Sequence, residues 1–460
     1  MSRPTKRIGL DVQSNGKMLR LYLQSILFVA LCSQALPAQA AEMPATLEQA
    51  WQRALRNHPS LVAALSKLDS ARAQIGTARN AWLPTASIDA NHSQTMAAQA
   101  SAPSTVQGSK SADSFTFTPS FQLTGSARWT AYDFGRTSAS IDAAEKGALA
   151  AEQDVRALRA QLWQGVASTW LSVLGADAAL DVVRAGRDQL ARTRDLVTRA
   201  VSVRAKPDID RLKAEADLAA AEGDVLRAEE VARAQRQVLA VAMGERRVAA
   251  GPVSEPVFDL GAAATVTFDD DAGIDGLLAQ AVEKRPEYAA LRERVAALHA
   301  QLLVAERATR PSLYVSGVTQ ASGTAWSDAS THVAGTVGLS VPLSALWTSG
   351  PQVSDTKAQI ATLIANRDNQ VLALRGQVVA ALSAWLQAKK RLPVAQSQAR
   401  FAQAARDAAQ TRYKAGAGLW IELADAETAV IKAQLAVVQA RLDQKSAEAQ
   451  LQVLLGQAGL

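Results

Sequence analysis

The residue types that most often carry out chemistry are few and widely spaced in this sequence. The one cysteine is Cys32, and the four histidines are His58, His92, His299 and His332. None of them forms an HExxH or another paired-ligand spacing. The run Asp269–Asp271 offers carboxylates to a cation, but no oxygen-rich ligand pattern follows it, and a loop with a helix cap is the more common case. We find no nucleophile, metal or phosphate-binding arrangement, so no enzyme activity and no cofactor are expected.

Composition and charge exclude further classes of protein. The chain has 460 residues, of which 48% are hydrophobic and 5% aromatic. Such a chain can bury a sizeable core, and its bias towards Ala, Gln, Leu, Val and Arg is typical of long helices. The net charge is +6, but residues 1–40 hold five Lys or Arg and one Asp. The remainder has 44 Lys or Arg against 42 Asp or Glu, a net charge of +2. No nucleic-acid partner is therefore expected.

Residues 1–40 have the features of a secretory signal peptide. Arg20 provides a positive charge, Leu21–Leu31 is apolar, and Ala38-Gln39-Ala40 is an A-x-A cleavage site. Met18 is an alternative start, because the 17 residues before it form a segment that is unusually long and polar for the beginning of a signal peptide. Cys32 follows Leu31 rather than a small residue, which disfavours a lipoprotein; a buried N-terminal helix is the structural alternative. No later run reaches about 18 uncharged apolar residues, so we expect an exported chain without a membrane-spanning helix.

The sequence matches itself along most of its length. The segment AWQRALRNHP at 50–59 matches LLAQAVEKRP at 277–286, an offset of 227 residues. Later matches have offsets of 215 and then 212, and they pair Gly135 with Gly350, Trp170 with Trp385, and Ala214-Glu215 with Ala426-Glu427. A drifting offset indicates two homologous halves that differ in loop length. We predict a first structural repeat at 41–250, a linker rich in Gly, Pro, Ala and Asp at 251–273, and a second repeat at 274–460.

Each half predicts the same order of elements: helix, strand, loop, strand, long helix, turn and long helix. Alternation of apolar and polar residues predicts strands at 85–94 and 115–131, and again at 312–320 and 333–343. The long helices are expected at 135–202, 207–243, 351–415 and 419–455, with Pro393 interrupting the third. The fold class is mixed α and β, mostly α, with two tandem repeats of two strands each.

Strands in which apolar and polar residues alternate can occur in two settings in an exported protein, a soluble sheet or a transmembrane barrel. In a soluble sheet the apolar face covers a core, whereas in a transmembrane barrel it meets lipid and the polar face meets the lumen. Four strands are too few to close a barrel, and an open edge is not tolerated in lipid. If these strands span a membrane, several chains must therefore pool them.

The chain resembles the TolC family of outer-membrane efflux proteins. The resemblance is carried by the duplicated starts TLEQAWQRALRNHPSL and LLAQAVEKRPEYAAL, by WTAYDFGRTSA after the strands, and by the hairpin TRYKAGAGLWIELADAE. It implies a homotrimer whose twelve-strand β-barrel crosses the outer membrane, in contact with lipid, and continues into a twelve-helix periplasmic α-barrel. It also implies a channel of a tripartite export system, with a periplasmic adaptor and an inner-membrane transporter of the ABC or RND class, and no enzyme.

The same resemblance implies a closing tip where the long helices turn, at 203–210 and 416–422. It places a constriction at Glu422 and Asp425, which share a helix face because they are three residues apart. Two solvated acids at a helix start are the alternative reading. It also places a latching acid at Asp210, whose usual basic partner falls on Gly418; an ordinary acid at a helix start is the alternative for Asp210. Arg204, Lys206 and Arg211 are the candidate substitutes, and Gly416 and Gly418 fit a turn with unusual backbone angles.

Several other residues have two open interpretations. Arg199 and Arg412 precede the two turns and are either adaptor contacts or solvated residues. Trp129, Tyr132 and Phe134 end a strand and either form a membrane aromatic girdle or pack where strand meets helix. For the whole chain the leading hypothesis is an exit duct for type I protein secretion or small-molecule efflux. The alternative is a periplasmic coiled-coil scaffold or adaptor protein without a pore.

Overall fold

The computed structural model describes residues 42–99, 114–249, 251–258, 260 and 271–457. The predicted signal peptide, Cys32, Asp269 and Asp270 lie outside these ranges. The described chain is mostly helical, with one four-stranded sheet.

The elements follow the same order in both parts of the chain. The first part contains α2 (Leu47–Asn57), α3 (Pro59–Asn80), β1 (Thr85–Gln99), β2 (Ser114–Tyr132), α4 (Arg136–Ser202) and α5 (Asp208–Ala242). The second contains α6 (Asp271–Lys284), α7 (Pro286–Glu306), β3 (Ser312–Gly323), β4 (Ser330–Ser340), α8 (Ala345–Lys414) and α9 (Trp420–Leu454). Two 3₁₀ turns, Arg307–Thr309 and Trp326–Asp328, flank β3.

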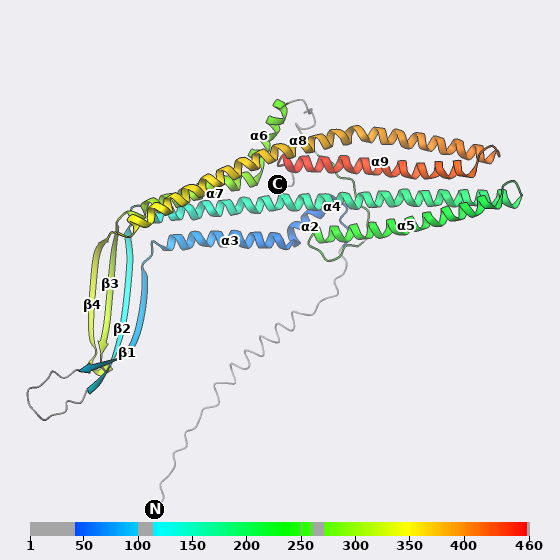
Figure 1. The fold of residues 1–460 in the computed structure, drawn as a ribbon. Coiled ribbons are helices and arrows are strands. Elements are labelled where there is room, and N and C mark those ends of the chain that lie inside the picture. Colours follow the sequence, from blue (N-terminus) through cyan, green and yellow to red (C-terminus); the bar gives the residue numbers. More distant parts are fainter. Residues whose placement is uncertain (1–41, 100–113, 250, 259, 261–270, 458–460) are drawn as a thin grey trace, which may run out of the picture.

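The molecule is elongated, with the sheet at one end and two helical hairpins at the other (Figure 1). Helices α4 and α5 form one hairpin and α8 and α9 form the second, while α3 and α7 run back along them towards the sheet. Helix α4 has 67 residues, so at 1.5 Å per residue it is about 100 Å long. Pro59 and Pro286 each occupy the first turn of a helix, where a missing N–H costs no hydrogen bond.

Helix α8 differs from the sequence prediction at both of its prolines. It begins at Ala345, before Pro351, and continues through Pro393 to Lys414. Both prolines are exposed. Since Pro393 cannot donate to the carbonyl of Lys389, that carbonyl loses its helical partner, but on an exposed face water can replace it. The expected interruption at Pro393 was therefore wrong, because packing on either side sustains the helix.

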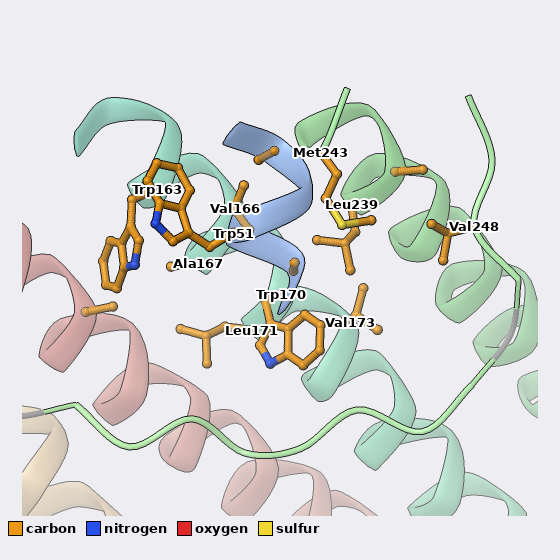
Figure 2. Packing of buried hydrophobic residues seen from close by; sticks show 14 of the residues in the cluster. Trp51, Trp163, Val166, Ala167, Trp170, Leu171, Val173, Leu239, Met243 and Val248 are labelled. Carbon is orange, nitrogen blue, oxygen red and sulfur yellow. The ribbon is translucent and has the colours of Figure 1, made fainter. Parts of the chain in front are cut away.

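Two equivalent hydrophobic cores lie midway along the helices. In the first, Trp51 of α2 packs against Trp163, Val166 and Trp170 of α4, together with Leu239 of α5 and Met243, which directly follows α5 (Figure 2). In the second, Leu277 of α6 packs against Val378, Leu382 and Trp385 of α8. Trp170 and Trp385 are 0% and 4% exposed, so both pack in the helical core.

Helices α4 and α9 join the two hairpins, and they approach each other closely at two glycines. A Cβ at Gly186 would come within 2.9 Å of Ile431 Cγ1, and one at Gly175 would overlap Leu442 Cδ1. Gly175 and Gly186 are eleven residues apart on α4, as are Ile431 and Leu442 on α9. Each large side chain thus fills the space that a missing Cβ leaves on the partner helix.

The four strands form one antiparallel sheet in the order β1-β2-β3-β4. In the described residues, β1 and β4 each have a neighbouring strand on one side only. A β-bulge at Ala131 interrupts the β2–β3 ladder, so that Thr130 pairs with Tyr314 and Tyr132 pairs with Leu313. The sheet therefore has two open edges, which β-proteins normally pair or cover.

By length and composition alone, α4 and α8 each contain a window apolar enough to cross a membrane. Each is several times longer than a bilayer core is thick, and each supplies the tryptophan-centred core described above. We attribute their apolar residues to packing between helices.

Candidate functional site

The turns that join the long helices lie side by side at the end of the molecule opposite the sheet (Figure 1). Gly416 has φ +78°, and Arg204 has φ +58° at the corresponding point of the first turn. This conformation is easy for glycine but costs a residue with a Cβ about 1 kcal/mol or more. Gly418 is required for a different reason, since a Cβ there would come within 3.0 Å of the Tyr413 backbone nitrogen.

Tyr413 is the centre of the contacts between the two turns. Its side chain is 1% exposed and packs against Trp420, Leu423 and Val197. Its hydroxyl donates to Asp210 Oδ2 at 3.0 Å. Burial, and then the hydrogen bond to Asp210, raise the pKa of the Tyr413 phenol well above its usual value. The hydroxyl therefore stays protonated and joins the two hairpins.

The predicted substitutes for a basic partner at Gly418 divide into different roles. Lys206 Nζ lies 4.4 Å from the centre of the Tyr413 ring and donates to the Gly418 carbonyl at 3.4 Å. Arg211 instead pairs within α5, with Asp208 and Glu215 at 2.8 Å each. The guanidinium of Arg211 lowers the pKa of the Asp208 carboxyl through that hydrogen bond. Of these basic side chains, Lys206 is thus the one that bridges the two turns.

Glu422 and Asp425 are exposed on the first two turns of α9, while Leu423 between them is buried. Arg412 Nη2 lies 3.7 Å from Glu422 Oε2 across the turn, a pairing that sequence reasoning missed. Because both side chains are well exposed, this ion pair contributes little to stability. Arg199 donates to the Asp195 carbonyl at 3.2 Å, which suits a cation in the last turn of a helix.

A buried carboxylate lies between the hairpins, further from the turns. Glu427 of α9 is 3% exposed and accepts a hydrogen bond of 2.6 Å from Thr193 Oγ1 of α4. Burial raises the pKa of Glu427, although Thr193, Gln189 and Arg406 act in the opposite direction. The repeat match with Glu215 identified the place of Glu427 on a helix, but Glu215 is only partly buried and pairs with Arg211. The burial of Glu427 follows from the contact between α4 and α9, which no local sequence pattern encodes.

The registers of the sheet sort its side chains onto two different faces, because directly paired residues point the same way. One face is apolar and exposed, and its members include Ile88, Phe117, Leu123, Trp129, Val315, Val333, Val337 and Leu339. The opposite face is polar, with hydroxyl pairs Ser87–Ser126 at 2.9 Å and Ser93–Ser120 at 2.8 Å. Ile88 and Val333 are each 81% exposed, so no described residue covers the apolar face at these positions.

The predicted aromatic residues gather where the sheet meets the helices. The bulge at Ala131 brings Tyr132 onto the same face as Trp129. Tyr132 stacks edge-on against Phe134 at 4.9 Å, and Trp129 Nε1 donates to the Trp82 carbonyl at 2.8 Å. Trp82 and Trp347 were missed, although the offset of 215 pairs Trp347 with Tyr132. We call Trp82, Trp129, Tyr132, Phe134 and Trp347 the junction aromatics; all are exposed.

Asp133 fixes the direction in which α4 leaves the sheet. Its carboxylate is buried and accepts from the backbone N–H groups of Gly135 and Thr137, at 3.1 and 2.7 Å, and from the Thr137 hydroxyl. Arg307 donates to the Gly135 carbonyl at 2.7 Å. The two backbone bonds to Asp133 satisfy N–H groups that a helix start leaves without partners, while the Gly135 carbonyl also accepts from the Ala139 N–H within the helix. Among the described residues, no three His, Cys, Asp or Glu side chains cluster as metal ligands.

Two of three comparisons relate the chain to known proteins. The profile of the outer membrane efflux protein family matches residues 50–245 and again residues 277–457. A comparison with curated proteins found no match. Solved structures share the fold. The outer-membrane channel OprN is 21% identical, with a TM-score of 0.74 and 90% of each chain covered.

Two further solved structures are similar. The outer membrane protein VceC of Vibrio cholerae is 18% identical, with a TM-score of 0.71 over 89% of this chain and 96% of its own. The MtrE outer membrane channel of Neisseria gonorrhoeae is 22% identical, with a TM-score of 0.70 over 92% of this chain and 93% of its own. The family consists of outer-membrane channels rather than enzymes. The two profile matches cover most of the sequence, and the chain therefore belongs to the outer membrane efflux protein family.

Proposed function

We propose that three copies of this chain form an exit duct through the outer membrane. The observation that carries the proposal is the sheet, which has an exposed apolar face and two open edges. In lipid, backbone groups at an open edge would lack hydrogen-bond partners, so only a closed barrel is stable there. Three chains supply twelve strands, an even number within the range of known outer-membrane barrels.

The long hairpins continue this duct into the periplasm as a twelve-helix α-barrel. The apolar strand face then meets lipid, the polar face lines the lumen, and the junction aromatics lie at the membrane–water boundary, where such side chains are enriched. The mature chain begins after a signal peptide at 1–40 that is cleaved, and its repeats span 41–250 and 274–460 around the linker.

The hairpin turns close the periplasmic end of the duct. Glu422 and Asp425 of three chains give six carboxylates near one constriction, which attracts cations. Asp210, Arg204, Gly416 and Gly418 shape the turns and their contacts. A periplasmic adaptor docks at this end, with Arg199 and Arg412 among its contacts, and joins the duct to an inner-membrane transporter of the ABC or RND class.

Planar bilayers test the constriction. Glu422→Gln and Asp425→Asn together remove the charge without changing side-chain volume and should lower cation selectivity. Arg412→Gln should raise it, because it frees the Glu422 carboxylate from its ion pair. Channels whose selectivity is the same in all three proteins would refute the constriction at these positions.

The cargo is either small molecules or a protein secreted by a type I system. The family description favours efflux, whereas the absence of a small residue before Cys32 disfavours the lipoprotein form that many dedicated drug-pump ducts have. Deletion of the gene separates the two. Loss of one large secreted protein, restored by complementation, identifies secretion; unchanged secretion with increased drug susceptibility identifies efflux.

A further inference from the structure

The side chain of Arg128, on the polar face of the sheet, is held in place by residues of the two neighbouring strands β3 and β4. The four strands contain one Asp and one Arg, Asp89 and Arg128. The register places both on the polar face, since Asp89 pairs with Thr124 and Arg128 pairs with Thr85. Four residues of strand separate these two pairs, about 13 Å at the usual rise. The distance is too great for an ion pair between them.

The guanidinium of Arg128 is fixed by an aromatic ring. Its central carbon lies 3.9 Å from the centre of the Tyr314 ring on β3, within the range of a cation–π interaction. Tyr314 in turn pairs with Gly338 on β4, and a Cβ at Gly338 would come within 2.7 Å of the phenol carbon and oxygen. Because Gly338 has no side chain, the Tyr314 ring can lie directly over its backbone.

This arrangement leaves the hydrogen-bonding edge of Arg128 available. The residue is exposed, and within the described part of the chain its guanidinium forms no ion pair and no side-chain hydrogen bond. The ring occupies one flat face of the guanidinium but none of its N–H donors. A planar group with fixed N–H donors suits carboxylate and phosphate oxygens.

We propose that Arg128, stacked on Tyr314 over Gly338, is an anion-selecting residue in the lumen of the β-barrel. The inference relies on the proposed trimeric duct, in which three copies bring three guanidinium groups to one level near the junction with the helices. Anionic groups of the cargo, carboxylates or phosphates, bind there transiently. The duct thus has a negative constriction at the turns and a positive ring at the base of the barrel.

Reversal potentials in planar bilayers under a gradient of KCl test this assignment. In wild type the ring favours Cl⁻ within the barrel, so Arg128→Gln should raise the K⁺/Cl⁻ permeability ratio by about twofold or more at low salt, where fixed charges are weakly screened. Tyr314→Leu should shift the ratio part of the way, because the guanidinium is then no longer held. Tyr314→Phe, which keeps the ring, should leave the ratio unchanged.

A second variant covers the case in which Arg128→Gln fails to assemble. Ser316 lies directly opposite Arg128 in the register, so Ser316→Glu places a carboxylate next to the guanidinium and should raise the same ratio. The decisive protein is Arg128→Gln or, where only that variant assembles, Ser316→Glu. If its channels conduct but keep the wild-type permeability ratio, the role of Arg128 is overturned and the duct is left intact. Wild-type protein that neither conducts nor forms three-fold particles in lipid overturns the duct itself.

Discussion

The contact between α4 and α9 makes a specific prediction about two glycines of the same helix. Gly165 and Gly175 both lie inside α4. A Cβ at Gly165 would have no atom within 4 Å, whereas one at Gly175 would overlap Leu442 Cδ1 and come within 3.1 Å of its Cγ. Because Cγ is also close, a rotation of the terminal methyl groups alone does not relieve the overlap, so Leu442 must take another χ1 rotamer or the two helices must move apart.

The same substitution should therefore have opposite effects at the two positions. Gly165→Ala should stabilise the protein by about 0.5–1 kcal/mol, since alanine loses less backbone entropy in a helix. Gly175→Ala has that gain too, but overpacking costs about 1–3 kcal/mol. We expect a net loss on the order of 1 kcal/mol.

Thermal unfolding of the purified protein in detergent, followed by circular dichroism, measures the difference. The two variants should shift the midpoint in opposite directions by about 2 °C or less in a chain of this size. In the Leu442→Ala background the overlap is gone, so Gly175→Ala should become neutral or stabilising. A Gly175→Ala protein as stable as Gly165→Ala would show that α4 and α9 are not packed this closely.

Three further predictions use matched substitutions and the same unfolding assay. Trp170→Phe should destabilise the protein about 1 kcal/mol more than Trp385→Phe through loss of a hydrogen bond. The Trp170 indole N–H donates to the Ser254 carbonyl at 3.1 Å, while the buried Trp385 indole N–H has no hydrogen-bond partner among the described residues. Equal losses would contradict this. Burial raises the pKa of Glu427, so the stability of the protein should fall as pH rises above the usual carboxyl pKa. Glu427→Gln should flatten this pH dependence. A pH profile that is unchanged in Glu427→Gln would count against a buried carboxylate. Asp133→Ala should cost about 1–2 kcal/mol through loss of the α4 cap, unlike Asp142→Ala at an exposed position of the same helix; similar values for both would exclude a capping role.

The element order was predictable because it depends on local patterns. Period-two alternation located all four strands, and long proline-free runs located most of the helices. Contacts between distant segments were not predictable in this way. The burial of Glu427 against Thr193 and the approach of α9 to Gly175 depend on residues more than 200 positions apart. Pro393 misled the prediction because a proline breaks a helix in isolation, while packing sustains this one.

The candidate site was predictable in part, for similar reasons. The turns and their glycines are encoded locally, so Gly416 and the position of Arg204 could be located. The Tyr413–Asp210 bond and the role of Lys206 join two turns that only the tertiary fold brings together. The ion pair of Arg412 with Glu422 spans a single turn, and it depends on how that turn folds back. The bulge at Ala131 reversed the face of Tyr132, since one extra residue shifts every later side chain.

Electron microscopy of the full-length protein in lipid nanodiscs tests the central claim most directly. Three copies that pool their strands should give hollow particles with three-fold symmetry, in which a barrel within the disc continues into a long tube outside it. Compact monomers beside the disc, or particles without a central channel, would contradict the duct.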